Sequence, residues 1–260
     1  MDIVDEALRW LNDPLNWSGP GGVLALTWAH LWISVTAVAL ACLVALPVGL
    51  WLGRRGRGAR LGVVVANTTR ALPTLALLTL LAASGLFGST ATIIACAVFA
   101  LPPLLTGAVD GLVGVDHQAV DAATGMGMSR WRRLWTVELP LAVPVIGAGV
   151  RTAAVQVVAT VPLAALVGGR SLGTIIVTGF GTLHYGQVVA GGLLVAALCL
   201  VAEGLLALGQ RALTPVGLRS LARSDRDSQH PDQRDGARRR RPPRGREPSG
   251  PSLEQLPTQL

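Results

Sequence analysis

The sequence predicts an all-α integral membrane protein, and composition, run length and residue pattern each support this. Of the 260 residues, 51% are hydrophobic and only 14% are charged, whereas soluble domains average about 25% charged residues. Long runs with almost no charge recur at 31–52, 72–86 and 193–208. Within lipid the backbone must satisfy its own hydrogen bonds, and an uncharged run of about 20 residues does so as a helix. Strands of a membrane barrel would instead alternate polar and apolar residues.

Five membrane-spanning helices are expected. The second begins at Ala71, because placing Arg70 at the bilayer centre would cost about 2.5–3.5 kcal/mol. Arg70 then lies at the inner interface or, alternatively, lines a polar path through the membrane. The third span is expected to be broken at Pro102-Pro103, and a Gly-rich loop is expected at 168–186. The expected spans are about 24–52, 71–87, 90–112, 141–167 and 187–208.

The distribution of arginine predicts the orientation of these spans. The loop at 54–60, the segment at 116–138 and the chain after Gln210 fall on one side and contain most of the 22 basic residues, all of them Arg. The other side has Arg9 among four acidic residues, and Arg170. Because loops rich in Lys and Arg stay in the cytoplasm, the N-terminus is expected outside and the C-terminus inside.

Three regions follow from this reading. Residues 1–22 form an extracytoplasmic N-terminal segment, acidic at its start and so unlike a cleavable signal, with a short interfacial helix. Residues 23–210 form the transmembrane domain. Residues 211–260 form a cytoplasmic tail too polar to fold by itself, whose arginines at 238–241 either bind anionic lipid headgroups or only mark the topology.

Several kinds of chemistry are not expected. The chain has no Lys, so it cannot build the phosphate-binding loop that places a Lys on a nucleotide. Cys42, Cys96 and Cys199 are far apart in apolar runs and have no metal-ligand spacing. The four His residues are scattered. We therefore expect no enzymatic activity, no bound metal or cofactor, and no nucleic-acid partner.

The segment 116–140 is the most informative part of the sequence. It predicts two short helices, with Gly125 and Gly127 at the bend and Ser129 as the N-cap of the second. In the second helix Trp131, Leu134 and Trp135 are spaced i, i+3 and i+4 and form one apolar stripe flanked by arginines. Such a stripe either docks on a partner protein or rests on the chain's own inner face and the membrane interface.

The same segment resembles a known family motif. Asp121-Ala122-Ala123, three residues, Gly127, nine residues and then Val137-Glu138-Leu139-Pro140 is similar to the EAA loop of ABC importer permeases. The family pattern is Glu-Ala-Ala, three residues, Gly, nine residues, Ile, one residue and Leu-Pro. This chain has Asp121 in place of Glu and Val137 in place of Ile, and both changes keep the chemical character.

Other segments resemble the osmoprotectant and quaternary-amine permeases of that family. The stretch 67–77 is similar to their Asn-x-x-x-x-Ile-Pro-Ser-Leu-Ala-Leu segment, and Glu138–Pro144, Gly149–Ala153 and 165–173 look alike as well. The subgroup's Arg-Asn-Thr-Tyr-Thr-Gly is replaced here by the different stretch Thr106–Gly111. Within transport, an ABC permease for methionine or another amino acid is the nearest alternative, and a secondary transporter is an alternative of another class.

The resemblance implies a type I ABC importer permease with a MetI-like fold in the bacterial cell membrane. It implies partners: an ATPase subunit that hydrolyses the ATP, a second permease copy or paralogue, and an extracytoplasmic substrate-binding protein that delivers glycine betaine, choline, carnitine or proline. Arg70, Asp110 and Arg151 are candidates for a substrate path or gate. The residues implied to couple to the ATPase are Asp121, Ala122, Ala123, Gly127, Arg130, Trp131, Leu134, Trp135, Leu139 and Pro140.

Overall fold

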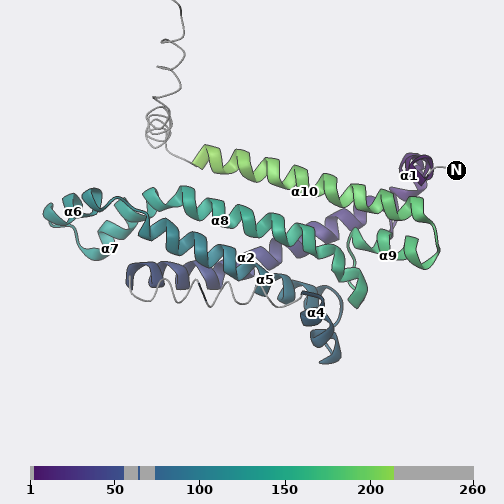
Figure 1. Ribbon diagram of the computed structural model, residues 1–260, viewed down its shortest axis with the longest axis horizontal. Coiled ribbons are helices and arrows are strands. Elements are labelled where there is room, and N and C mark those ends of the chain that lie inside the picture. The colour runs from purple at the N-terminus through teal and green to yellow at the C-terminus, as the bar shows by residue number, and fades with distance from the viewer. Residues whose placement is uncertain (1–2, 56–63, 65–73, 214–260) are drawn as a thin grey trace, which may run out of the picture. The chain divides into compact units, whose positions relative to one another are not determined.

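The computed structural model describes residues 3–55, 64 and 74–213, and this part of the chain contains helices and turns but no strand (Figure 1). In chain order the elements are α1 (Ile3–Asn12), η1 (Pro14–Asn16), α2 (Val23–Arg55), α4 (Thr74–Ala83), α5 (Gly88–Val113), α6 (His117–Gly125), α7 (Arg130–Arg133), the π-helical turn η3 (Leu134–Glu138), α8 (Leu139–Thr160), the 3-10 helix η4 (Val161–Val167), α9 (Gly173–Gly181) and α10 (Tyr185–Leu213).

Four helical stretches in the described residues are long and apolar enough to cross a membrane: Val23–Arg55, Gly88–Val113, Arg130–Val167 and Tyr185–Arg211. They confirm four of the expected spans. The remaining one contains α4, an apolar helix of 10 residues. Arg70 and the tail from residue 214 lie outside the described residues. The count of five spans, the orientation and the three-region division therefore stay predictions.

The long helices run side by side, with α1 and α9 at one end and α6 and α7 at the other (Figure 1). α5 packs most extensively on α2 and α8, and α8 also packs on α10. The main core lies where α2, α5, α8 and η4 meet, and its largest members include Ile33, Leu104, Val157 and Val161. In the same region His30 of α2 contacts the carbonyl oxygen of Val158 in α8 through Nε2, at 2.9 Å.

Small residues set the distance between these helices. A Cβ atom added to Gly107 of α5 would lie 2.8 Å from Cα of Gly149 in α8. A Cβ on Gly149 would lie 2.8 Å from the carbonyl oxygen of Pro103. In lipid there is little hydrophobic drive between helices, so association depends on close backbone approach of this kind. The crossing at Gly107 and Gly149 therefore fixes how α8 sits on α5.

Two expectations about the spans are wrong. α5 continues without interruption through Pro102 and Pro103, both of which are buried. A proline in a membrane helix is tolerated where neighbouring helices pack around it, and the α5–α8 contact does so here. The expected loop at 168–186 contains α9, and Ile175 on the buried side of this helix packs against α2 and α10.

The expected short N-terminal helix is confirmed as α1, which packs along α10. Ala7 is buried, while Ile3, Val4 and Leu8 are more than half exposed. A helix with one buried face and one exposed apolar face is typical of the membrane–water interface.

Candidate functional site

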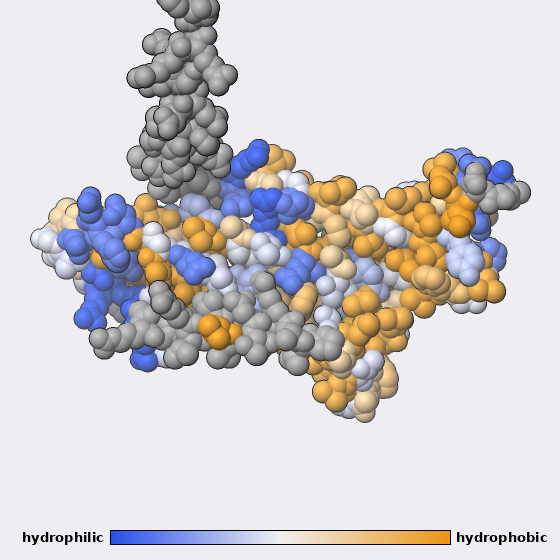
Figure 2. Space-filling model, viewed as in Figure 1, coloured by the Kyte–Doolittle hydropathy of each residue, from blue (hydrophilic) through white to orange (hydrophobic). Residues whose placement is uncertain are grey.

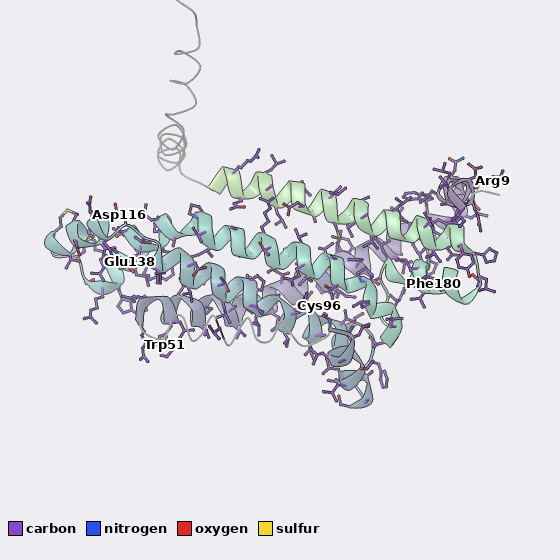
Figure 3. All side chains as sticks on the ribbon, viewed as in Figure 1. Arg9, Trp51, Cys96, Asp116, Glu138 and Phe180 are labelled. Carbon is purple, nitrogen blue, oxygen red and sulfur yellow. The ribbon has the colours of Figure 1, made fainter. Side chains whose placement is uncertain are left out.

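The stretch between α5 and α8, residues 114–138, is called the inter-span segment below. It lies at one end of the helices, where Figure 3 labels Asp116 and Glu138, and Trp51 of α2 lies at the same end. Arg9 and Phe180 lie at the opposite end (Figure 3). Space-filling Figure 2 shows hydrophilic residues gathered at the end that carries the inter-span segment, and this end is called the basic end. Its described arginines are Arg54, Arg55, Arg130, Arg132 and Arg133.

α6 is bounded by two hydrogen-bonded caps. At its start the Asp116 carboxylate accepts a hydrogen bond from the Gln118 amide at 2.9 Å. At its end the Met128 amide donates to the Ala123 carbonyl at 3.2 Å, and the Gly127 amide donates to the Thr124 carbonyl at 2.9 Å. These two bonds form a Schellman motif, in which the residue after the C-cap needs a left-handed backbone. Gly127 has φ +76°, so the glycine expected at the bend is the one that ends α6.

The second helix begins as expected but does not stand alone. The Ser129 hydroxyl accepts from the Arg132 amide at 3.4 Å and caps α7. After Arg133 the chain makes one π-helical turn, in which the Leu139 amide donates to the Leu134 carbonyl, and then continues as α8. Pro140 lacks the amide hydrogen that would bond the Thr136 carbonyl in a regular α-helix, and single π turns are common at functional sites. α7 is therefore the first turn of a long helix that includes the fourth span.

The Arg133 side chain connects α6 to the start of α8. Its Nη1 donates to the Thr124 hydroxyl of α6 at 2.7 Å, and its Nε donates to Oε1 of Glu138 at 2.6 Å. Glu138 is buried, with 7% of its surface exposed. The bond to Glu138 joins two ionised groups and is about twice as strong as a neutral hydrogen bond, while the bond to Thr124 connects the same guanidinium to α6. Sequence reasoning missed this link, because the five-residue spacing of Arg133 and Glu138 brings them together only through the π turn.

The tryptophan stripe faces the chain's own α2. Trp131, Leu134 and Trp135 line one cavity together with the last turns of α2. Leu134 is buried, 5% exposed, while Trp131 and Trp135 are 67% and 61% exposed. Leu134 thus packs within the chain, whereas the two tryptophans stay largely exposed, so docking on a partner and rest on the chain's own inner face both stay predictions.

The remaining residues implied to couple to an ATPase differ in accessibility. Asp121, Ala122 and Gly127 are exposed, and no hydrogen bond joins the Asp121 side chain to another described residue. Ala123 is buried, 1% exposed, so its small size serves packing within the chain. Of the remaining residues in this set, Arg130 and Pro140 are exposed, whereas Leu139 is partly buried.

A second polar cluster lies between α8 and α10. Arg151 forms an ion pair with Glu203 and contacts Gln210, whose amide also donates to the Pro144 carbonyl at 3.0 Å. A cavity of about 700 Å³ lies beside this pair. The sequence singled out Arg151 as a path candidate but gave no signal for its pairing with Glu203, 52 residues away. Asp110 is exposed on α5 and does not line this cavity.

Among the described residues there is no group of three or more His, Cys, Asp or Glu side chains that could hold a metal ion.

Comparison with known proteins places these features in a family. Residues 45–214 match the family described as binding-protein-dependent transport system inner membrane component. The glycine betaine/carnitine/choline permease OpuCB of Bacillus subtilis is 32% identical, over 77% of this chain and 93% of its own length. The choline permease OpuBB of the same organism is 34% identical, over 77% of this chain and 93% of its own length. The osmoprotectant import permease OsmW of Salmonella typhimurium is 31% identical, over 76% of this chain and 95% of its own length.

The fold is also known from solved structures. An inward-facing form of the MetNI methionine ABC transporter contains a chain that superimposes with a TM-score of 0.65 at 20% identity, covering 74% of this chain and 96% of that one. This supports the MetI-like fold expected from the sequence. The chain belongs to the family of binding-protein-dependent transport system inner membrane components, the permease subunits of ABC importers, and is a multi-pass protein of the bacterial membrane.

Proposed function

We propose that this chain forms the membrane path for a small osmoprotectant, with glycine betaine, choline, carnitine and proline as the candidate solutes. The support comes from relatives above 30% identity whose names state glycine betaine, carnitine, choline or osmoprotectant transport. The methionine transporter shares the fold, but its identity of 20% is too low to indicate which solute this chain carries.

The proposed site of energy coupling is α6. ATP is bound and hydrolysed by a separate subunit, and α6 docks into that subunit with Asp121, Ala122 and Gly127 at the contact. The observation that carries this proposal is the Arg133 link: one side chain bonds Thr124 of α6 and Glu138 at the start of α8. A push on α6 is thereby transmitted directly to a membrane span. The exposed Asp121 carboxylate is available to a partner.

The proposed path runs beside the Arg151–Glu203 pair. Both side chains are part-exposed, 35% and 38%, in the middle of two spanning helices. Ionisable groups at membrane depth face a bundle interior or a water-filled cavity, because lipid does not solvate them. We infer that a second permease copy or a paralogue packs across this surface and encloses an aqueous path. A substrate-binding protein delivers the solute at the end that carries α1 and α9.

Reconstitution tests this function. The chain, its ATPase and its binding protein are placed in vesicles with ATP inside or outside, and uptake of radiolabelled glycine betaine, choline, carnitine, proline and methionine is measured. We expect ATP-dependent uptake of at least one of the first four. Uptake of methionine alone would favour the amino-acid alternative. Uptake that follows an ion gradient and needs no ATPase subunit would show a secondary transporter instead.

A further inference from the structure

A cavity of about 1160 Å³ separates the last turns of α2 from the inter-span segment. The α2 side contributes apolar residues that include Leu46, Leu50 and Trp51, followed one turn later by Arg54 and Arg55. The inter-span segment closes the other side with α7 and the π turn. The function proposed above uses none of the α2 residues, so the role of this cavity is a separate question.

The wall of the cavity is amphiphilic along the axis of α2. Leu46, Leu50 and Trp51 form the part toward the middle of the span, whereas Arg54 and Arg55 form the part at its end. Arg130 and Arg133 of α7 also line the cavity, and Arg133 is already paired with Glu138. No carboxylate lines the cavity among the residues that the structure describes. An occupant that fits has an apolar body on the membrane side and negative charge at the basic end.

Aromatic rings hold the guanidinium groups in place. The Arg55 guanidinium lies 3.9 Å from the centroid of the Trp51 ring, and that of Arg54 lies 5.8 Å from the centroid of Trp131. Arg54 also donates to the Arg130 carbonyl at 3.3 Å. Cation–π contacts of this kind are worth about 0.5–1 kcal/mol at exposed sites, and tryptophan is the residue that favours headgroup depth. The charges are thus positioned where lipid phosphates lie.

From this geometry we propose that the cavity binds one anionic phospholipid of the adjacent leaflet. The phosphate is held by Arg54, Arg55 and Arg130, and the acyl chains lie along Leu46 and Leu50. The bound lipid then fills the space between α2 and α7.

A lipid fits this cavity better than a protein partner does. The apolar wall of the cavity continues into the outer face of α2, where Leu43 and Val48 are 74% and 42% exposed. That face belongs to a helix long and apolar enough to span the membrane, so its natural neighbour is acyl chain. A soluble ATPase subunit would meet the tip of α6, not residues that lie inward of the headgroups.

Lipid competition tests the proposal on the full-length chain. The purified protein is placed in phosphatidylcholine vesicles, and tryptophan quenching by brominated phosphatidylglycerol is compared with quenching by brominated phosphatidylcholine. The variants are Arg55→Gln and, as a matched control, Arg132→Gln, which removes the same charge from α7 outside the cavity. Gel filtration and circular dichroism check that each variant is folded. Co-purification of the ATPase subunit is recorded for each.

Wild type should prefer the brominated phosphatidylglycerol, and Arg55→Gln should weaken this preference about fivefold, the factor given by about 1 kcal/mol per basic residue near an anionic surface. Arg132→Gln should keep it. An equal loss in both variants would show a diffuse charge effect and overturn the site, as would the absence of any preference in wild type. Loss of the ATPase subunit from Arg55→Gln with lipid preference unchanged would assign the surface to the ATPase and overturn the proposal, while leaving the importer function intact.

Discussion

Arg133 and Glu138 form an ion pair with 2.6 Å between Nε and Oε1 across a single π-helical turn, and the same guanidinium bonds Thr124 of α6. The buried carboxylate ties the inter-span segment to the first residues of a membrane span. If a separate ATPase subunit docks on α6, as proposed, a connection of this kind carries the movement of that partner to the membrane.

Breaking this pair should both destabilise the chain and weaken coupling. Glu138→Gln leaves Arg133 without its charged partner, and a hydrogen bond between charged groups contributes about 1.5–3 kcal/mol. We expect the free energy of unfolding, measured by SDS titration of the purified chain, to fall by about 2 kcal/mol. Arg132→Gln, on the exposed side of α7, should change it by less than about 0.5 kcal/mol. Equal effects of the two variants would argue against the link.

The left-handed backbone at Gly127 predicts a second, local effect. Gly127→Ala places a Cβ where a left-handed conformation costs about 1–2 kcal/mol, although no atom lies within 4 Å of that position. Hydrogen exchange at the Met128 amide should therefore speed up by about five- to thirtyfold. Gly125→Ala is the matched control, since it has equal space and no positive φ. Unchanged exchange in Gly127→Ala would contradict the Schellman turn.

The helix crossing at Gly107 offers a test of packing within the membrane. In Gly107→Ala the new methyl group meets the backbone of Gly149 at 2.8 Å, and overpacking typically costs about 1–3 kcal/mol. Gly204→Ala on α10, where nothing lies within 4 Å, should be neutral or slightly stabilising. SDS titration of both variants measures the difference. A neutral Gly107→Ala would mean that α5 and α8 are farther apart than described.

Variants of the Arg151–Glu203 pair should affect the free energy of unfolding and solute uptake differently. Arg151→Gln and Glu203→Gln each leave one charge without its partner and, because both side chains are partly exposed, should lower the free energy of unfolding by about 1 kcal/mol or less. The double variant removes both charges and should recover most of that loss. If the pair lines the path, solute uptake by the double variant remains low despite its recovered stability. Full uptake would make the pair a purely structural tie between α8 and α10.

Sequence reasoning succeeded where the signal was local. Apolar run length predicted the spans that contain α2, α5, α8 and α10, and capping chemistry predicted the end of α6 and the start of α7. Ser129 and Gly127 have the roles expected because a cap or a left-handed turn depends on only a few neighbouring residues.

Sequence reasoning failed where contacts with neighbouring helices determine the structure. Pro102 and Pro103 do not break α5, because α8 packs around them. The glycines around α9 suggested a loop, yet Ile175 of this helix is buried against α2 and α10. The pairings of Arg133 with Glu138 and of Arg151 with Glu203 depend on a π turn and on a long-range helix contact, and neither leaves a pattern in one sequence.

Co-purification of the ATPase subunit tests the central claim, that α6 is the docking site. The tagged chain is isolated from its native membrane in mild detergent as wild type, as Ala122→Arg, and as Thr182→Arg, which adds the same side chain at an exposed position after α9. Partners are identified by mass spectrometry. The account predicts that wild type and Thr182→Arg retain an ATPase subunit and that Ala122→Arg, still folded and inserted, loses it. An ATPase subunit that stays bound to Ala122→Arg at the wild-type level, or that is absent from wild type, would contradict it.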